Sequence, residues 1–245
     1  MYVARRAAYL RACTRIAEEL STDPFASRFK SEPIYAAVVG NDTRDAATTE
    51  VFLRWHLLCG ITLTELYRRV ALNDAIGQPR LHTLEGLPWS TASLRYAQVA
   101  LELVGFTAVV EVGGGYGGQR VLAPWVVDYH IVDLPEALEV QGAYLGHLGL
   151  SFGPHTPDAL PMVWPGAFFL SDFALSEFEP AIAERYFAVL AARCAAGRIT
   201  AADDRAAWIA ELARAAFEAV DVSPESPASS SRHANSVIRF TGRRA

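Results

Sequence analysis

The second half of the chain alternates between short apolar runs and longer stretches with helical spacing. The apolar runs are rich in β-branched and aromatic residues: "TAVVEV", "YHIVD", "GAFFLS", "GRITAA", "FEAVDV" and "SVIRFT". Between them lie "LPEALEVQGAYLGHLG" and "EPAIAERYFAVLAARCAAG", with Pro135 and Pro180 near their starts and Gly197 at the end of the second. Such positions of proline and glycine are typical of helix boundaries. The alternation is typical of βαβ units and predicts a mainly parallel sheet, with one further strand within "LGLSFGPH".

The connection between the last two predicted strands limits how they can pair. It consists of "SPESPASSSRHAN", which has no room for a crossover helix of ordinary length. A parallel return needs about a dozen residues or more and usually contains a helix, so we expect these strands to be antiparallel. The expected fold is therefore α/β and Rossmann-like, with a mainly parallel seven-stranded sheet and an antiparallel last-strand element.

The first hundred residues are predicted to be mostly helical. The stretch "TEVFLRWHLLCG" is apolar almost all round, which predicts a buried helix in which His56 is a core residue with a backbone partner. Thr64 is expected to cap "ELYRRVAL", and Ser90 to cap "TASLRYAQVALELVG". We expect residues 1–105 to form a helical cap over the substrate and residues 106–245 to form the ligand-binding domain.

The charge and cysteine content exclude several classes of partner. The chain has 22 Lys and Arg against 27 Asp and Glu, a formal net charge of -5, which argues against binding to a phosphate backbone. Cys13, Cys59 and Cys194 are widely spaced and are expected to be buried thiols in a reducing compartment. The sequence shows neither a long uncharged apolar run nor the pattern of a secretory signal. We expect a cytoplasmic protein without a nucleic-acid or membrane partner.

The stretch "VVEVGGGYGGQRVL" is a glycine-rich turn after the first predicted parallel strand. Gly113, Gly115 and Gly117 fall where open parallel sheets bind ligands. Glycine adopts positive φ there and lets the backbone approach a ligand closely. Asp133 ends the second strand, about 20 residues later, where a carboxylate can accept hydrogen bonds from both ribose hydroxyls. These features predict a ligand that contains a nucleoside.

Glu111 helps to distinguish between two such ligands. Gly113, Gly115 and Gly118 also satisfy the GxGxxG pattern of dinucleotide-binding folds, so the glycines alone leave NAD(P) open. The carboxylate of Glu111, just before them, can bind an ammonium group but repels a pyrophosphate. S-adenosylmethionine carries an ammonium and a ribose but no phosphate. The sequence favours an S-adenosylmethionine-dependent methyltransferase; an NAD(P)-dependent oxidoreductase and a non-catalytic S-adenosylmethionine-binding protein are the alternatives.

Five stretches from Asn73 onwards are similar to one known family. They are "NDAIGQP", "STASLRYAQVALEL", "VVEVGGGYGG", "YHIVDLPEALEVQGAYL" and "LSDFALSEFE". In this combination they resemble the sugar O-methyltransferases of bacterial glycan and secondary-metabolite pathways. The resemblance implies a Rossmann-like fold, S-adenosyl-L-methionine as methyl donor, and a hydroxyl of a sugar or glycosylated small molecule as acceptor. It also implies that the cofactor is held by Glu111, Gly113, Gly115 and Gly117 at its methionine end and by Asp133 at its ribose.

The resemblance also marks Arg95 and Tyr96 on the helix before the first strand. They would contact the cofactor carboxylate or the acceptor, since a guanidinium suits carboxylates. The alternative is an ion pair that holds the helical cap to the core. Tyr116, inside the glycine loop, would pack on the methionine chain or would simply be a partly exposed loop residue. Trp89 and Arg95 are expected to help select the acceptor.

Methyl transfer to an alcohol requires a group that removes the hydroxyl proton as the new bond forms. The candidates are Asp172 after the fourth predicted strand of the sheet, Glu177 a few residues later, and His233 near the start of the last strand. Each has a structural alternative. Asp172 could orient the cofactor, Glu177 could support the next helix, and His233 could be a solvated loop residue.

Asp172 could also meet Asp203 and Asp204 at a magnesium site, because carboxylates with waters suit Mg²⁺. Asp203 and Asp204 stand where a cap for "RAAWIAELARAAF" is expected, which is a commoner role, so we assign no metal ligand. The sequence leaves the acceptor's identity and the oligomeric state open, a homo-oligomer included.

Overall fold

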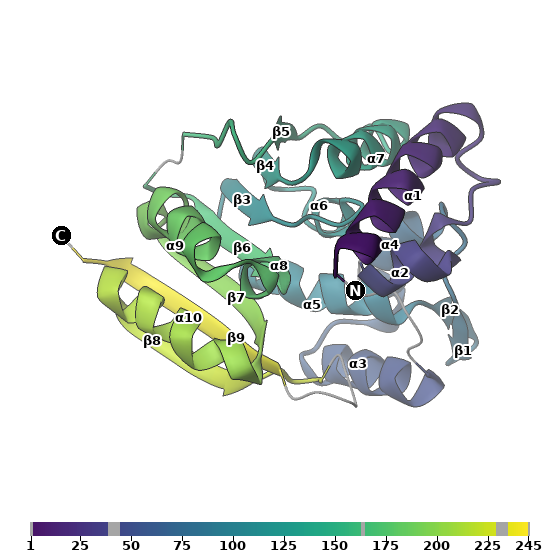
Figure 1. Ribbon diagram of the computed structural model, residues 1–245. Helices are drawn as coiled ribbons and strands as arrows, with labels where there is room; N and C mark the ends of the chain where they lie inside the picture. Colours follow the sequence, from purple (N-terminus) through teal and green to yellow (C-terminus); the bar gives the residue numbers. More distant parts are fainter. Residues whose placement is uncertain (1, 39–44, 163–164, 229–234, 245) are drawn as a thin grey trace. The chain divides into compact units, whose positions relative to one another are not determined.

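The computed structural model describes residues 2–38, 45–162, 165–228 and 235–244 (Figure 1). The chain forms two compact units. The first unit comprises residues 1–102, 115–124 and 134–151, and the second comprises residues 103–114, 125–133 and 152–245. The chain therefore passes from the second unit to the first within the glycine loop, between Gly114 and Gly115.

The second unit contains a seven-stranded sheet. Its strands are β3 (Ala108–Val112), β4 (Asp128–Val132), β5 (Gly153–His155), β6 (Phe168–Asp172), β7 (Ala196–Ala202), β8 (Phe217–Pro224) and β9 (Asn235–Arg243). Their order across the sheet is β5-β4-β3-β6-β7-β9-β8 (Figure 1). The pairings from β5 to β7 are parallel, and β9 is antiparallel to both β7 and β8. The predicted strands and the antiparallel last strand are confirmed.

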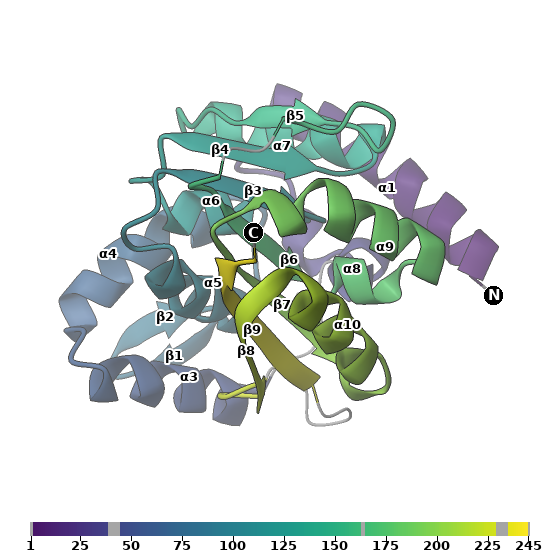
Figure 2. The ribbon, with the colours of Figure 1, turned by 90° about the vertical axis from the view of Figure 1, so that its left-hand side faces the viewer.

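Three α-helices and a short 3-10 helix accompany this sheet in the second unit. They are α8 (Ala174–Glu177), α9 (Pro180–Val189), the 3-10 helix η2 (Ala191–Arg193) and α10 (Asp203–Ala216). In Figure 2, α10 lies along β8 and β9. Apolar residues of the strands and helices form one buried core, with Phe169, Phe217 and Phe240 among its largest side chains.

The helix that starts at Pro180 ends earlier than the sequence suggests. Gly197, expected to end it, lies inside β7 instead. A Cβ atom at Gly197 would lie 2.4 Å from the ring of Phe240, so this strand position needs a residue without a side chain. The glycine therefore marks a close approach in the sheet and is not a helix stop.

The first unit is mainly helical. Its elements are α1 (Tyr2–Thr22), the 3-10 helix η1 (Phe29–Ser31), α2 (Pro33–Val38), α3 (Ala46–Leu58), α4 (Leu63–Asp74), the hairpin of β1 (His82–Leu84) and β2 (Leu87–Trp89), α5 (Thr91–Glu102), α6 (Gly118–Leu122) and α7 (Pro135–His147). The hairpin was not expected from the sequence. In Figure 1, α1 lies beside α7, which starts at Pro135 as expected.

Helix α3 is buried on one face only, so the prediction of a helix buried all round is wrong. Phe52 and Leu53 are buried, whereas Val51 is 53% and Leu58 is 87% exposed. Apolar content alone does not set burial, because a helix at the surface covers the core with one stripe. The prediction for His56 is confirmed: it is fully buried, and its Nε2 lies 2.8 Å from the Leu94 carbonyl oxygen.

The two predicted helix caps have different outcomes. Ser90 accepts a hydrogen bond from the Ser93 N–H at 3.1 Å, as expected for a cap of α5. The cap of α4 is Thr62, not Thr64: its hydroxyl accepts from the Glu65 N–H at 3.2 Å. Thr62 has the extended backbone of a cap residue, and the helix begins at Leu63.

The three cysteines are not all buried. Cys13 and Cys194 are, and burial raises the pKa of the Cys194 thiol to about 12. Cys59 is exposed because it follows the last turn of α3, so its predicted burial is wrong. In the part of the chain that the structure describes, no helix is both long enough and apolar enough to cross a membrane.

Candidate functional site

Glu111 is a buried carboxylate near the carboxyl end of β3. Its side chain is 4% exposed, and it pairs in the parallel register with Ile131 on one side and Leu170 on the other. The Tyr129 hydroxyl donates a hydrogen bond to its Oε2 at 2.8 Å. A buried carboxylate is costly unless its charge is satisfied. Glu111 is therefore a fixed acceptor at the strand end where the sequence predicts an ammonium site.

Gly113 and Gly114 bring the backbone close to its neighbours directly after β3. Gly113 has φ +77°, and its N–H donates to the Val132 carbonyl at 3.0 Å. A Cβ atom at Gly113 would lie 2.2 Å from the Cβ of Ala174, and one at Gly114 would lie 2.7 Å from Cγ2 of Ile131. The first two residues of the loop therefore need to lack a Cβ atom, and the close approach of a backbone to a ligand has the same requirement.

Gly115 and Gly117 belong to the first unit and also have positive φ, +59° and +89°. The Gly115 carbonyl accepts a hydrogen bond from Nε2 of Gln141 on α7 at 3.1 Å. Gly117 is the residue before α6, and a Cβ atom there would lie 3.0 Å from Leu145 of the same α7. The positive φ and the contact with α7 both favour glycine at Gly117.

Asp133 follows β4 in the second unit and is partly exposed. Its N–H donates to the His155 carbonyl of β5 at 3.1 Å, which fixes its backbone. Its charge also contributes to raising the pKa of Tyr186, behind the larger effect of burial, so the two side chains belong to one electrostatic neighbourhood. A partly exposed carboxylate at this edge of the sheet is accessible to a polar ligand.

Asp172 ends β6, and most of its carboxylate is enclosed. Its side chain is 11% exposed, and its Oδ1 accepts a hydrogen bond from the Thr200 hydroxyl at 2.6 Å. Nε of the buried Arg198 lies 3.9 Å from the same oxygen. These contacts anchor Asp172 to β7, and both of its predicted roles, as base or in orienting the cofactor, stay predictions.

The backbone is strained directly after Asp172. Phe173 has φ +72°, which is rare for a residue with a bulky side chain. Such strain is often found at functional sites. It redirects the chain from β6 into α8, which ends at Glu177. Glu177 keeps an exposed surface, yet burial removes enough water from its carboxyl to raise its pKa above the ordinary value.

Four predicted contact residues of the first unit are buried. Trp89 and Tyr116 are fully buried, Arg95 is 6% exposed and Tyr96 is 8% exposed. The Tyr116 ring makes edge contacts with Tyr96 and with two other rings, so it is not a partly exposed loop residue. Trp89 packs on Tyr67 and donates to the Leu84 carbonyl at 3.0 Å. Their roles toward a ligand stay predictions.

Two other sequence expectations lie wholly or partly outside the described residues. His233 is outside them, and so is the side chain of Asp203. Within the described residues, no three His, Cys, Asp or Glu side chains are grouped as a metal site requires.

One polar cluster in the first unit was missed in the sequence. We call it the Asn73 cluster; it consists of Lys30, Asn73, Asp74, Ser90, Ser93, Tyr116 and Tyr144. Nδ2 of Asn73 donates to Ser93 at 2.6 Å and to the Tyr116 hydroxyl at 3.0 Å, while its Oδ1 accepts from Tyr144 at 2.7 Å. The signal that could have revealed it is that four of the five family-like stretches supply all of these residues except Lys30.

The strand order identifies the class of fold. Numbered in chain order, the seven strands run 3-2-1-4-5-7-6, with the seventh antiparallel. This is the order of the class I methyltransferase fold, a Rossmann-like α/β fold. In that fold, as in other open α/β sheets, ligands bind at the carboxyl ends of the strands, where Glu111, Gly113 and Asp133 lie in the second unit.

The solved structures that match part of this chain include several methyltransferases. They include a Pyrococcus horikoshii protein provisionally assigned as an RNA methyltransferase (12% identity, covering 74% of this chain and 98% of that chain, TM-score 0.49). A tRNA (uracil-54, C5)-methyltransferase of Pyrococcus abyssi with S-adenosyl-L-homocysteine has 11% identity over 66% of this chain and 44% of that chain, with a TM-score of 0.49. The glycopeptide N-methyltransferase MtfA, also with S-adenosyl-L-homocysteine, has 10% identity over 61% of this chain and 86% of that chain, with a TM-score of 0.47. No protein-family model and no curated protein sequence matches the chain.

Proposed function

We propose that the protein is an S-adenosylmethionine-dependent O-methyltransferase that acts on a hydroxyl of a sugar or glycosylated small molecule. The observation that carries the cofactor assignment is the buried carboxylate of Glu111 next to the bare backbone of Gly113 and Gly114. Glu111 would bind the ammonium group, and Asp133 would bind the ribose hydroxyls. The bound cofactor would supply an electrophilic methyl group. A pyrophosphate would be repelled by Glu111, which disfavours NAD(P).

Calorimetry is expected to detect binding of S-adenosylmethionine and S-adenosylhomocysteine and to detect none of NAD(P)H. Glu111→Gln and Asp133→Asn should each weaken S-adenosylhomocysteine binding by about tenfold to a hundredfold, because each removes a charge-assisted hydrogen bond. Asp221→Asn, at an exposed carboxylate of β8, is the matched control and should bind as the wild type does. Binding of NAD(P)H alone would refute the proposal in favour of an oxidoreductase.

The sugar acceptor is supported by the family-like stretches and by the chain's acidic charge, which suits a small neutral acceptor better than a nucleic acid. A panel of sugars and glycosides, assayed for transfer of a labelled methyl group, tests this part of the proposal. Tight cofactor binding without transfer to any of them would favour the non-catalytic alternative.

Among the predicted bases, we propose Glu177 as the residue that removes the acceptor proton. Its carboxyl has an exposed surface and a raised pKa, and a more basic carboxylate is a better proton acceptor near neutral pH. Asp172 is held by Thr200 and Arg198, so we propose that it positions the strand end at which Phe173 turns the chain.

Glu177→Gln should lower kcat by about a hundredfold or more, while the affinity for S-adenosylhomocysteine changes little. In the wild type, kcat should rise with pH through the raised pKa of Glu177, because only the deprotonated carboxylate accepts a proton. That rise should be absent in the variant. Glu184→Gln, at an exposed position of α9, is the control. Full turnover by Glu177→Gln would show that another residue is the base.

A further inference from the structure

Lys30 is a fully enclosed lysine in η1 of the first unit. Its side chain is 2% exposed, and its Nζ donates hydrogen bonds to the Asn73 carbonyl and, at 3.1 Å, to the Tyr144 hydroxyl. The same nitrogen lies 4.6 Å from the ring centroid of Tyr116 and 4.8 Å from that of Tyr144. Two aromatic faces and two oxygen acceptors form a cage that suits an ammonium group.

The ionisable groups that face Nζ are Asp74 of α4, Tyr116 of the glycine loop and Tyr144 of α7. Burial raises the pKa of both tyrosines well above 10, so they stay neutral. Asp74 favours the charged lysine, but its carboxylate is engaged by Ser90 and Ser93. The effect of burial is larger than that of Asp74, and it lowers the pKa of Lys30 to about 7. Lys30 therefore changes its charge near neutral pH.

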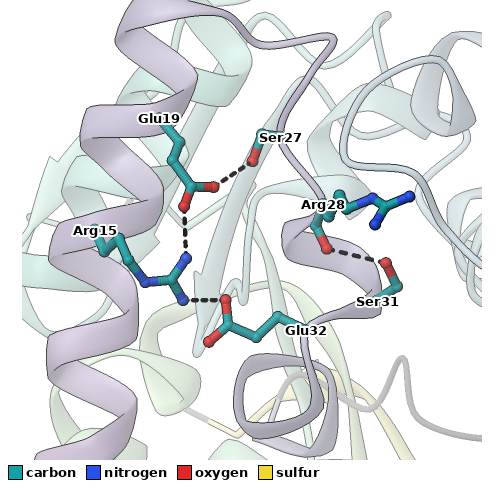
Figure 3. Close-up of polar contacts among 6 residues, drawn as sticks. All are labelled: Arg15, Glu19, Ser27, Arg28, Ser31 and Glu32. Carbon is teal, nitrogen blue, oxygen red and sulfur yellow. Dashed lines mark hydrogen bonds and ion pairs between the residues drawn. The ribbon is translucent and has the colours of Figure 1, made fainter.

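The backbone that carries Lys30 is held from both sides. Figure 3 shows the first side: Arg15 of α1 forms ion pairs with Glu19 and with Glu32, which follows η1, and the Ser27 hydroxyl donates to Glu19 at 3.0 Å. On the other side, the Lys30 N–H donates to the Gly77 carbonyl at 3.0 Å. A change of charge at Nζ therefore acts on the groups around Nζ more than on the lysine backbone.

Tyr116 links this cage to the glycine loop. It lies between Gly115 and Gly117, which have no side chains, so the ring of Tyr116 is what anchors the stretch of residues 115–117 by side-chain contacts. The ring is held edge-on by Phe29 at 5.4 Å and by Tyr144 at 5.2 Å between centroids. Its hydroxyl accepts from Asn73.

We propose that Lys30 is a positioning residue for the glycine loop: its ammonium group, seated against the Tyr116 ring, holds residues 115–117 in the conformation that binds the cofactor, and loss of its proton loosens them. The link to cofactor binding rests on the proposed function, whereas the link from Lys30 to the loop does not.

Loss of the Lys30 proton should have two effects of opposite sign, one on the order of the loop and one on the free energy of unfolding. As pH rises through about 7, the folded chain loses the ammonium of Lys30, so the loop should loosen. The unfolded chain keeps that proton up to about 10.5, so between these values the unfolded state binds more protons and the free energy of unfolding should rise with pH. The effect on unfolding follows from the burial of Lys30 alone, whereas a lysine that merely fills space would not loosen the loop.

Hydrogen exchange of the peptide containing residues 113–118, at pH 6 and pH 8.5 and corrected for intrinsic rates, tests the link from Lys30 to the loop. In the wild type, protection should fall by about thirtyfold at the higher pH, the size of a desolvated cation–π contact. Lys30→Met should show equal protection at both pH values. Arg28→Met, an exposed cation two residues away, should behave as the wild type. Wild-type pH dependence in Lys30→Met would overturn the proposal.

A second pair of variants covers the case in which Lys30→Met does not fold. Tyr116→Phe keeps the ring and should keep the pH dependence, whereas Tyr116→Leu removes the ring and should lose it.

Titration with S-adenosylhomocysteine separates the link from Lys30 to the loop from the link to cofactor binding. The affinity of the protein for S-adenosylhomocysteine should fall between pH 6 and pH 8.5 by the same factor as the hydrogen-exchange protection. It should do so only in variants that keep both Lys30 and an aromatic ring at position 116. A pH-independent affinity would overturn the link to cofactor binding, and no binding by the wild type at any pH would refute the cofactor assignment itself.

Discussion

Gly113→Ala is expected to lower the free energy of unfolding by about 2–5 kcal/mol, from overpacking and backbone strain together. The new Cβ atom would lie 2.2 Å from the Cβ of Ala174, which belongs to α8 and cannot rotate away as a long side chain could. The backbone at Gly113 also has φ +77°, which an alanine rarely adopts. Chemical denaturation monitored by circular dichroism measures the difference.

Gly142→Ala is the matched control for this substitution. Gly142 lies within α7, and a Cβ atom there would meet no atom within 4 Å. Alanine is the better helix former, so this variant should gain about 0.5–1 kcal/mol. If Gly113→Ala were as stable as the wild type, the close approach of the loop to α8 would be wrong.

Asn73→Leu is expected to cost about 2–4 kcal/mol of unfolding free energy, because a similar volume is kept while a buried hydrogen-bond network loses its centre. The Tyr116 hydroxyl would lose its donor, and Ser93 would lose the amide at 2.6 Å. Tyr144 keeps the Asn73 main-chain carbonyl as an acceptor at 3.0 Å, which limits the loss.

Ser21→Ala is the control for the Asn73 substitution. Ser21 is exposed near the end of α1, and its hydroxyl donates to the Ala17 carbonyl at 2.8 Å. Water replaces an exposed hydrogen bond at little cost, so the loss should stay below about 1 kcal/mol. Equal losses at Asn73 and Ser21 in urea denaturation would contradict the central role of Asn73.

The sheet could be predicted because its strands are encoded locally. Continuous apolar runs bounded by turn residues mark buried parallel strands, and the short link before β9 ruled out a parallel return. The glycines after β3 could be predicted for the same reason, since one stretch of sequence specifies one turn. The error at Gly197 arose because a glycine after a helical pattern has two explanations, and the ring of Phe240 decides between them only in three dimensions.

The Asn73 cluster could not be predicted because its residues come from η1, α4, α5, the glycine loop and α7. Each residue is ordinary in its own segment: a lysine in a polar stretch is usually solvated, and an asparagine near a glycine usually belongs to a turn. Only packing turns Lys30 into a buried cation and Asn73 into the centre of a network. The same reasoning explains Cys59, whose apolar neighbours belong to a helix with an exposed face.

The position of β9 between β7 and β8 determines how the sheet can be assembled. β8 precedes β9 in the chain but pairs only with it in the sheet, so β8 has no ladder partner until β9 is in place. The open edge of β7 can bind other strands until then. The sheet is therefore completed when β9 forms its backbone hydrogen bonds with β7 and β8 together. We expect this to be a late and cooperative step of folding.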